Sequence, residues 1–172
     1  SHQAIFVPFT GINGVDIRLL KEKGMALFNS HAHSHYVAER AFALILSLLG
    51  NIIPYHEGLM KGDWANRNGE KRIPWTSLFH KRVGFLGYGT INQILHTLLK
   101  PFEIQAFTLD RGKNYSDIKL VNDLKSLIQT SDIVVMALPL NPKSERLMNA
   151  SLLSLMKNKY LINVGRGATI DE

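Results

Sequence analysis

The chain has 172 residues, of which 45% are hydrophobic and 20% charged, and it carries a formal net charge of +6. This composition allows a buried core and argues against a long disordered segment, while the absence of cysteine excludes disulfide bonds and thiolate metal sites. The basic residues are scattered and have no aromatic-rich nucleic-acid motif beside them, so we expect no nucleic-acid partner. A chain without cysteine fits a reducing compartment, and we expect a cytoplasmic protein.

The first part of the sequence predicts two strands and two helices. Residues 4–9 (AIFVPF) are typical of a short buried strand and residues 25–29 (MALFN) of a second one, with an amphipathic helix between them that ends at Gly24. A helix predicted from Tyr36 to Leu49 is apolar on nearly every side, which indicates packing on more than one face. Its apolar run is far shorter than the ~20 residues needed to cross a bilayer, so we expect no membrane partner. We interpret Pro54 and residues 61–75 as a connection across the surface.

The second half of the sequence alternates strands with helices. Strand patterns cover residues 82–88, 104–110, 118–121, 132–140 and 160–165, and helix patterns cover residues 90–102, 122–131 and 144–157. Continuous apolar strands that alternate with amphipathic helices favour a parallel sheet covered on both faces. The predicted fold class is therefore α/β, with a doubly wound parallel sheet of the Rossmann type.

Three histidines, His31, His33 and His35, stand at alternate positions just before the predicted helix. In an extended loop this spacing sends His33 to the side opposite the other two. Two imidazoles without a neighbouring carboxylate or thiol do not complete a tetrahedral metal site. We therefore expect no metal site and a solvated loop near the cleft, with a weak adventitious zinc or nickel site as the alternative.

A glycine pattern, VGFLGYGTIN, stands where the strand at 82–88 turns into the next helix. Gly87 permits the tight turn, and Gly89 leaves room for a pyrophosphate to approach the backbone. The N–H groups of Thr90 and Ile91 open the helix towards the negative charge of that group. The pattern predicts a dinucleotide site, with an ordinary turn between strand and helix as the alternative.

Three further residues bear on this site. Asp110 ends the next strand, eighteen residues beyond Asn92, where a carboxylate accepts hydrogen bonds from the adenosine ribose and repels a 2′-phosphate. NAD is therefore favoured over NADP, although the adjacent Arg111 softens the preference. Asn92 occupies the place of the usual third glycine and is larger, so we expect a slightly displaced helix and a retained site.

Five stretches in order, TGINGVD, VAE, GFLGYGTIN with TLDR, LPLNPKSERLMN and INVGRGATIDE, make the chain resemble the D-2-hydroxyacid dehydrogenase family from near residue 5 to its end. The resemblance implies an NAD-dependent oxidoreductase of D-2-hydroxy acids and 2-keto acids of the phosphoglycerate, glycerate or hydroxypyruvate, glyoxylate or lactate type. It also implies a fragment that binds cofactor but lacks the family's catalytic glutamate and histidine, and that is inactive alone. The alternative is a non-catalytic module that senses a dinucleotide.

The same resemblance divides the chain and assigns its site. Residues 1–30 correspond to the end of a substrate-domain segment, residues 31–80 to a hinge helix and connection, and residues 81–172 to an NAD-binding domain that is incomplete at its C-terminus. Arg166 would clamp the substrate carboxylate and polarise the 2-keto oxygen, because its planar fork pairs with a carboxylate and stays charged. The substrate loop comprises Phe9, Thr10 and Gly11. Further cofactor contacts are expected from Val37, Pro139, Asn141, Ser144, Val164 and Gly165. The helix at 37–49 is expected to join a homodimer.

Overall fold

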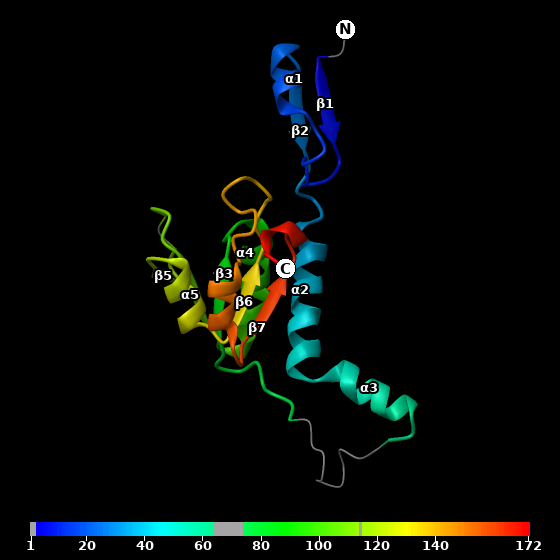
Figure 1. Cartoon of the computed structure of the whole chain (residues 1–172), viewed down its shortest axis with the longest axis vertical. Coiled ribbons are helices and arrows are strands. Elements are labelled where there is room, and N and C mark those ends of the chain that lie inside the picture. Colours follow the sequence, from blue (N-terminus) through cyan, green and yellow to red (C-terminus); the bar gives the residue numbers. More distant parts are fainter. Residues whose placement is uncertain (1–2, 64–73, 114) are drawn as a thin grey trace.

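The computed structural model describes residues 3–63, 74–113 and 115–172, so most of the predicted connection at 61–75 lies outside the described residues. A small β–α–β unit stands at one end, and the long helix α2 links it to a larger sheet (Figure 1). The unit consists of β1 (Ala4–Val7), α1 (Ile17–Glu22) and β2 (Ala26–Asn29), and its two strands pair in parallel. The Asp16 carboxylate begins α1 by accepting hydrogen bonds from the backbone N–H groups of Arg18 and Leu19.

The prediction of a buried strand over residues 4–9 is wrong in both extent and burial. Strand β1 ends at Val7, because the next residue is a proline without an N–H group to continue the ladder. Its residues alternate between exposed and half-buried, with Phe6 67% exposed. Two strands and one short helix bury too little surface to enclose the strand on both faces.

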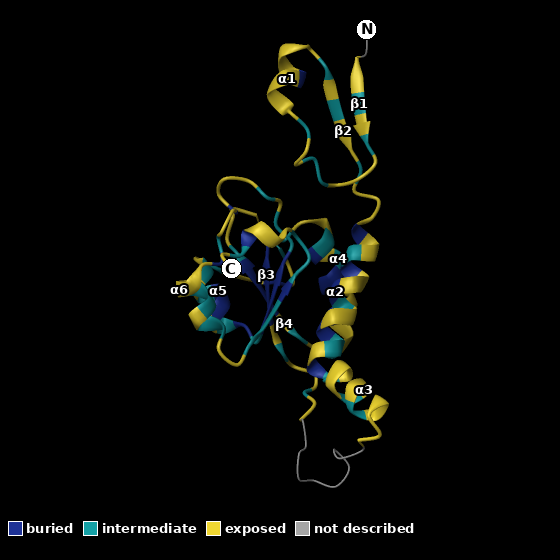
Figure 2. Cartoon of the chain, turned by 45° about the vertical axis from the view of Figure 1, so that its right-hand side comes forward, coloured by how far each residue is buried: buried dark blue, intermediate teal, exposed yellow. Residues whose placement is uncertain are grey.

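Helix α2 (Ser34–Leu49) starts two residues before its predicted beginning. Its buried face includes Ala38, Ala41 and Ile45, which pack in the core shared with helix α4 (Thr90–Leu99) and the sheet. The expectation of packing on more than one face is not met within the described residues, because Leu44 and Leu48 remain about 40% exposed. Figure 2 shows exposed residues along one side of α2 and buried ones along the other. The long apolar run therefore leaves part of α2 uncovered.

A helix, α3 (Ile52–Met60), occupies part of the region predicted as a connection. Pro54 is its third residue, where the first-turn N–H groups have no partner in the helix and a proline costs little. Asn51 adopts a left-handed conformation (φ 48°) at the junction, and the axes of α2 and α3 meet at 63°. Among the described residues, no single helix is long and apolar enough to cross a membrane, and α2 and α3 reach that length and composition only as this bent pair.

The larger sheet confirms the predicted fold class. Its strands are β3 (Arg82–Leu86), β4 (Gln105–Leu109), β5 (Lys119–Val121), β6 (Ile133–Met136) and β7 (Tyr160–Asn163). They lie in the order β5-β4-β3-β6-β7, and every neighbouring pair is parallel. Helices α2 and α4 pack in the core on one face, while α5 (Leu124–Thr130) and the short α6 (Ala150–Leu153) pack in the core on the other. The central strands β3 and β6 are almost wholly buried, as continuous apolar strands require.

Two of the predicted helices differ from the observed ones. Residues 144–157 form only α6 and a following 3-10 turn, Ser154–Met156, because the N–H groups of Arg146 and Met148 donate to the carbonyls of Ala168 and Thr169 instead of to a helix. Helix α5 begins after Asp123, not Asn122: the Asp123 carboxylate accepts a hydrogen bond of 2.8 Å from the N–H of Ser126.

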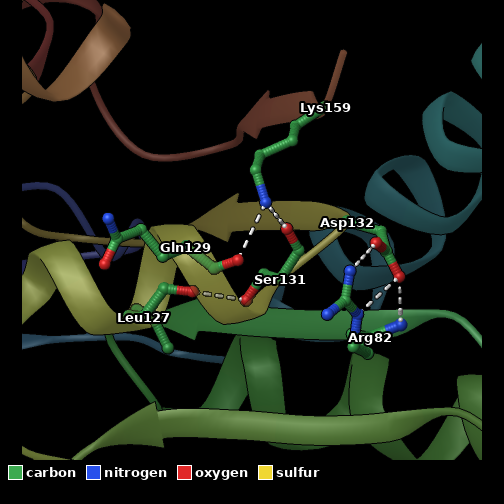
Figure 3. Close-up of polar contacts among 6 residues, drawn as sticks. All are labelled: Arg82, Leu127, Gln129, Ser131, Asp132 and Lys159. Atoms are coloured by element: carbon green, nitrogen blue, oxygen red, sulfur yellow. Dashed lines mark hydrogen bonds and ion pairs between the residues drawn. The ribbon is translucent and has the colours of Figure 1, made fainter. Parts of the chain in front are cut away.

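Polar contacts tie strands together at the amino ends of β3, β6 and β7 (Figure 3). The Asp132 carboxylate accepts hydrogen bonds from the backbone N–H, Nε and Nη2 of Arg82, at 2.9, 3.2 and 2.5 Å. The Lys159 ammonium donates to the carbonyls of Gln129 and Ser131 at the end of α5. Burial lowers the pKa of Lys159, with the Arg82 charge acting in the same direction. This network lies at the end of the sheet opposite the glycine pattern.

Candidate functional site

The carboxyl ends of four parallel strands bring the predicted motifs to one edge of the sheet. Gly87 follows β3, Asp110 follows β4, the 139–144 segment follows β6 and Arg166 follows β7. The motifs therefore share the edge at which doubly wound sheets bind ligands. A cavity of about 630 Å³ opens here, between the sheet edge, the start of α2 and the loop after β1.

The cavity collects most of the predicted site residues. Those that line it are Thr10, Gly11, Val37, Gly89, Thr90, Ile91, Pro139, Asn141, Val164, Gly165 and Arg166. The predicted residues that do not line it are Phe9, Gly87, Asp110, Arg111 and Ser144. His31 also lines the cavity, as expected of a loop near the cleft. The other lining residues are chiefly apolar, and a lone Ile or Leu carries no signal of a site in the sequence: Ile12, Asn13, Val15, Ile17, Ser34, Ala137, Leu138 and Leu140.

The turn from β3 into α4 has the backbone geometry that an anionic ligand needs. Gly87 has a φ of 87°, and a Cβ there would lie 2.9 Å from the Leu138 side chain and 3.0 Å from the Ala137 carbonyl oxygen. A Cβ on Gly89 would meet nothing within 4 Å, so the space beside its backbone is open. Within the described residues, the backbone N–H groups at 88–91 donate no hydrogen bond. Four free donors at the start of a ten-residue helix are an arrangement that suits an anion such as a phosphate group.

Asp110 stands at the end of β4, outside the cavity lining but at the same sheet edge. Its backbone N–H pairs with the Val121 carbonyl, and its Oδ1 accepts a hydrogen bond of 2.8 Å from the N–H of Gly112. The side chain is exposed, as is that of Arg111. A carboxylate fixed in this way retains acceptor capacity for a ribose hydroxyl.

The 139–144 segment forms a tight turn held by its own side chains. The Ser144 hydroxyl donates to the Pro139 carbonyl at 2.6 Å and accepts from the Asn141 N–H at 2.9 Å. The Asn141 Oδ1 accepts from the N–H groups of Lys143 and Ser144. Both side chains are thus engaged within the turn, so they shape the wall that Pro139 and Asn141 present to the cavity.

Arg166 faces the loop that follows β1. Its Nη1 donates to the Gly165 carbonyl at 3.1 Å, and a Cβ on Gly11 would overlap its guanidinium group. The N–H groups of Thr10 and Gly11 make no hydrogen bond with any described residue. Both residues line the same cavity as the guanidinium group of Arg166. Asn13 closes the loop onto the sheet edge, because its Nδ2 donates to the Leu140 carbonyl at 3.2 Å. This combination of amide donors and an arginine suits a carboxylate ligand.

The floor of the cavity is formed where β6 and β7 end. A Cβ on Gly165 would lie 2.7 Å from the Leu138 carbonyl oxygen, so only glycine lets the two strand ends meet this closely. The Val164 N–H extends the ladder by donating to the Met136 carbonyl at 3.0 Å. Val37, on the first turn of α2, lines the same cavity.

The three histidines are separated by the local fold. The loop they occupy is not extended: His33 precedes the first residue of α2, and His35 lies within the helix, so the alternation assumed for them is wrong. Only His31 lines the cavity, while the His33 ring lies between those of Phe9 and Tyr36 at centroid distances of 6.0 and 6.1 Å. Within residues 3–63, 74–113 and 115–172, no group of three metal-ligating side chains is placed to hold an ion.

A buried polar pair lies behind the glycine-rich turn. The Tyr88 hydroxyl is 2.6 Å from Nδ1 of His96, a buried residue of α4. Burial raises the pKa of Tyr88 to about 12 and lowers the pKa of His96. Both shifts favour the uncharged forms, so a neutral hydroxyl and a neutral imidazole share this hydrogen bond. The pair thus holds the half-buried Tyr88 ring against α4.

Comparison with known proteins places this site in a family. Residues 42–172 match the family described as "D-isomer specific 2-hydroxyacid dehydrogenase, NAD binding domain". The chain is 30% identical over 169 residues to the D-3-phosphoglycerate dehydrogenase of Methanocaldococcus jannaschii. The matched region covers 94% of this chain and 32% of that protein.

Two solved structures share the fold along nearly the whole chain. An acyclic imino acid reductase in complex with NADPH and D-Arg has a TM-score of 0.89 at 27% identity, over 98% of this chain and 55% of that one. The NAD-dependent formate dehydrogenase from Staphylococcus aureus in complex with NAD has a TM-score of 0.76 at 26% identity, over 98% and 52%. The chain thus spans about half, or less, of the length of these proteins.

Proposed function

We propose, since the chain belongs to the D-isomer specific 2-hydroxyacid dehydrogenases by the match of residues 42–172 to their NAD-binding domain, that it is the cofactor-binding part of an NAD-dependent oxidoreductase of D-2-hydroxy acids and 2-keto acids. One observation carries the proposal: free N–H groups of the turn after β3 and the side chain of Arg166 lie on the same cavity. A dinucleotide and a small acid are the two ligands that such a cavity would bring together.

The glycine-rich turn would hold the pyrophosphate of the cofactor. The free N–H groups at 88–91 point to this role, and the open space beside Gly89 gives the phosphates access to them. Val37, Val164 and Gly165 would enclose the nicotinamide end against water. When bound, the nicotinamide supplies or accepts the hydride, and the chain's contribution is to fix its position.

Arg166 would bind and polarise the substrate. The substrates proposed here all carry a carboxylate next to the reacting carbon, and the N–H groups of Thr10 and Gly11 would receive one of its oxygens. The Arg166 guanidinium would pair with the same carboxylate and stabilise the negative charge that develops on the 2-keto oxygen during reduction. This stabilisation needs no proton transfer from Arg166, whose charge is permanent.

The carboxylate of Asp110 supports a preference for NAD over NADP. It lies at the carboxyl end of β4 and would accept hydrogen bonds from the ribose hydroxyls, whereas a 2′-phosphate would bring two like charges together. The adjacent Arg111 would reduce this repulsion without removing it.

Calorimetric titration of the chain with NADH and NADPH tests the proposal. We expect saturable NADH binding, weaker NADPH binding, and a smaller difference between the two in Asp110→Asn, which keeps the size of the side chain. Glu57→Gln is the matched control: it removes the same charge from an exposed position of α3 and should leave both affinities unchanged. A folded chain that binds neither nucleotide would contradict the cofactor assignment, and equal affinities would contradict the role of Asp110.

The uncovered faces of α2 and α3 support a homodimer. Leu44 and Leu48 are 40% and 42% exposed, and Ile52 and Ile53 are 55% and 60% exposed, so apolar surface continues across the bend between the helices. Sedimentation of Leu48→Asp should show a monomer where the unaltered chain is a dimer. Leu120→Asp, at a residue of β5 that is 37% exposed, is the control and should still dimerise. A monomeric unaltered chain would refute this assignment.

A further inference from the structure

Asn92 stands where the glycine pattern has its usual third glycine, and its side chain is completely buried. Its Nδ2 donates a hydrogen bond of 2.7 Å to the Gly87 carbonyl and a second of 3.3 Å to the Val135 carbonyl. The amide therefore joins three elements: the turn after β3, strand β6 and the first turn of α4. A glycine at this position would make none of these contacts.

The bond to Gly87 fixes the direction of a peptide group in the turn after β3. In a planar trans peptide the C=O and the following N–H point to opposite sides. With the Gly87 carbonyl held by Asn92 on the inner side of the turn, the N–H of Tyr88 is directed away from the core. That N–H is the first of the free donors at 88–91.

The other half of the amide is unmatched. Oδ1 of Asn92 is buried and accepts no hydrogen bond from the described residues. A reversed amide would place this oxygen against the carbonyls of Gly87 and Val135, so the two bonds from Nδ2 determine its orientation. A buried acceptor without a donor costs free energy that a glycine would not incur. The amide is therefore satisfied only through Nδ2, whose shorter bond is to the carbonyl of the turn.

We propose that Asn92 is a positioning residue for the cofactor pyrophosphate, which holds the Gly87 peptide so that the free donors of the turn are already in place before the ligand arrives. The inference rests on the proposed cofactor site and adds to it. A preformed turn loses less conformational freedom on binding, and this raises affinity without a direct contact between Asn92 and the ligand.

Ligand titrations of Asn92→Gly and Asn92→Ala test the inference. Loss of one backbone-orienting hydrogen bond should weaken the binding of NADH and of ADP-ribose by roughly three- to tenfold in both variants. Binding of adenosine, which lacks the pyrophosphate and is measured by saturation-transfer NMR, should not change. A general loss of fold would weaken all three ligands together, so this comparison separates positioning from stability.

Ser131→Ala provides the matched control. Ser131 is also completely buried, and its hydroxyl donates to the Leu127 carbonyl at 2.6 Å, but it lies at the opposite end of the sheet (Figure 3). This variant should lose stability and keep its affinity for all three ligands. If Asn92→Gly binds NADH as tightly as the unaltered chain, or more tightly, the positioning role is wrong and the cofactor site stands. If the unaltered chain binds no NADH, both the site and the role of Asn92 are wrong.

Discussion

Asp132 joins the amino ends of the two central strands, and we predict that Asp132→Asn lowers the free energy of unfolding by about 1–2 kcal/mol at pH 7. Its carboxylate accepts three hydrogen bonds from Arg82, two of them from the guanidinium group. Each charge-assisted hydrogen bond contributes about 1.5–3 kcal/mol in a favourable setting. Because the side chains of Arg82 and Asp132 are 45% and 31% exposed, screening by solvent reduces the net contribution to the lower end of that range.

The contact between Arg82 and Asp132 also makes the free energy of unfolding depend on pH, and Asp132→Asn should lose this dependence. Hydrogen bonding from Arg82 holds the pKa of Asp132 below its ordinary value, and in return the pKa of Arg82 is raised. Between the folded and unfolded pKa values of the carboxyl, the unfolded chain binds more protons than the folded one, so stability rises with pH in that window. The contribution is therefore complete above about pH 4, the ordinary range of an aspartate, and disappears as the pH falls through the lower folded value.

Urea unfolding at pH 7 and at pH 3 measures both effects. Asp171→Asn serves as the control, because Asp171 faces Arg146 at 3.5 Å in an exposed ion pair that should contribute less than about 0.5 kcal/mol. The gap between the unaltered chain and Asp132→Asn should narrow at pH 3. The predicted role of Asp132 is wrong if Asp132→Asn is no less stable than Asp171→Asn at pH 7. It is also wrong if Asp132→Asn loses the same free energy of unfolding, relative to the unaltered chain, at both pH values.

Three further predictions follow from the core and the site. Arg166→Lys in the intact protein should lower kcat/KM for a 2-keto acid by about 10²-fold or more in steady-state kinetics, with NADH affinity unchanged, because a point charge replaces a planar fork. Ile45→Ala should lower the free energy of unfolding by about 2–5 kcal/mol, against less than about 1 kcal/mol for Leu44→Ala, since Ile45 is fully buried and Leu44 is 40% exposed. Burial lowers the pKa of His96, so below about pH 6.5 the unfolded chain binds more protons than the folded one, and stability should decrease as the pH is lowered. In urea unfolding, His96→Gln should reduce this dependence of stability on pH.

Local patterns in the sequence were enough to predict the larger sheet. Strands buried on both faces need continuous apolar residues, and such runs are visible without any tertiary information. The glycines at 87 and 89 were predictable for the same kind of reason, because a positive φ and an open backbone each favour glycine.

Long-range contacts decided what the local patterns could not. The predicted helix over 144–157 gave way because N–H groups at Arg146 and Met148 found carbonyl partners more than twenty residues away. His31, His33 and His35 were separated by the exact start of α2, and a run of residue types does not fix such a boundary. From the sequence, Asn92 is only a larger residue in the place of a glycine. In the structure its amide donates to the carbonyls of Gly87 and Val135, and Val135 lies in a strand 43 residues away along the chain. The sequence alone determined which residues reach the sheet edge, because alternating strands and helices imply a parallel sheet whose carboxyl ends share one edge. What these residues bond to there depends on atoms that only folding brings together.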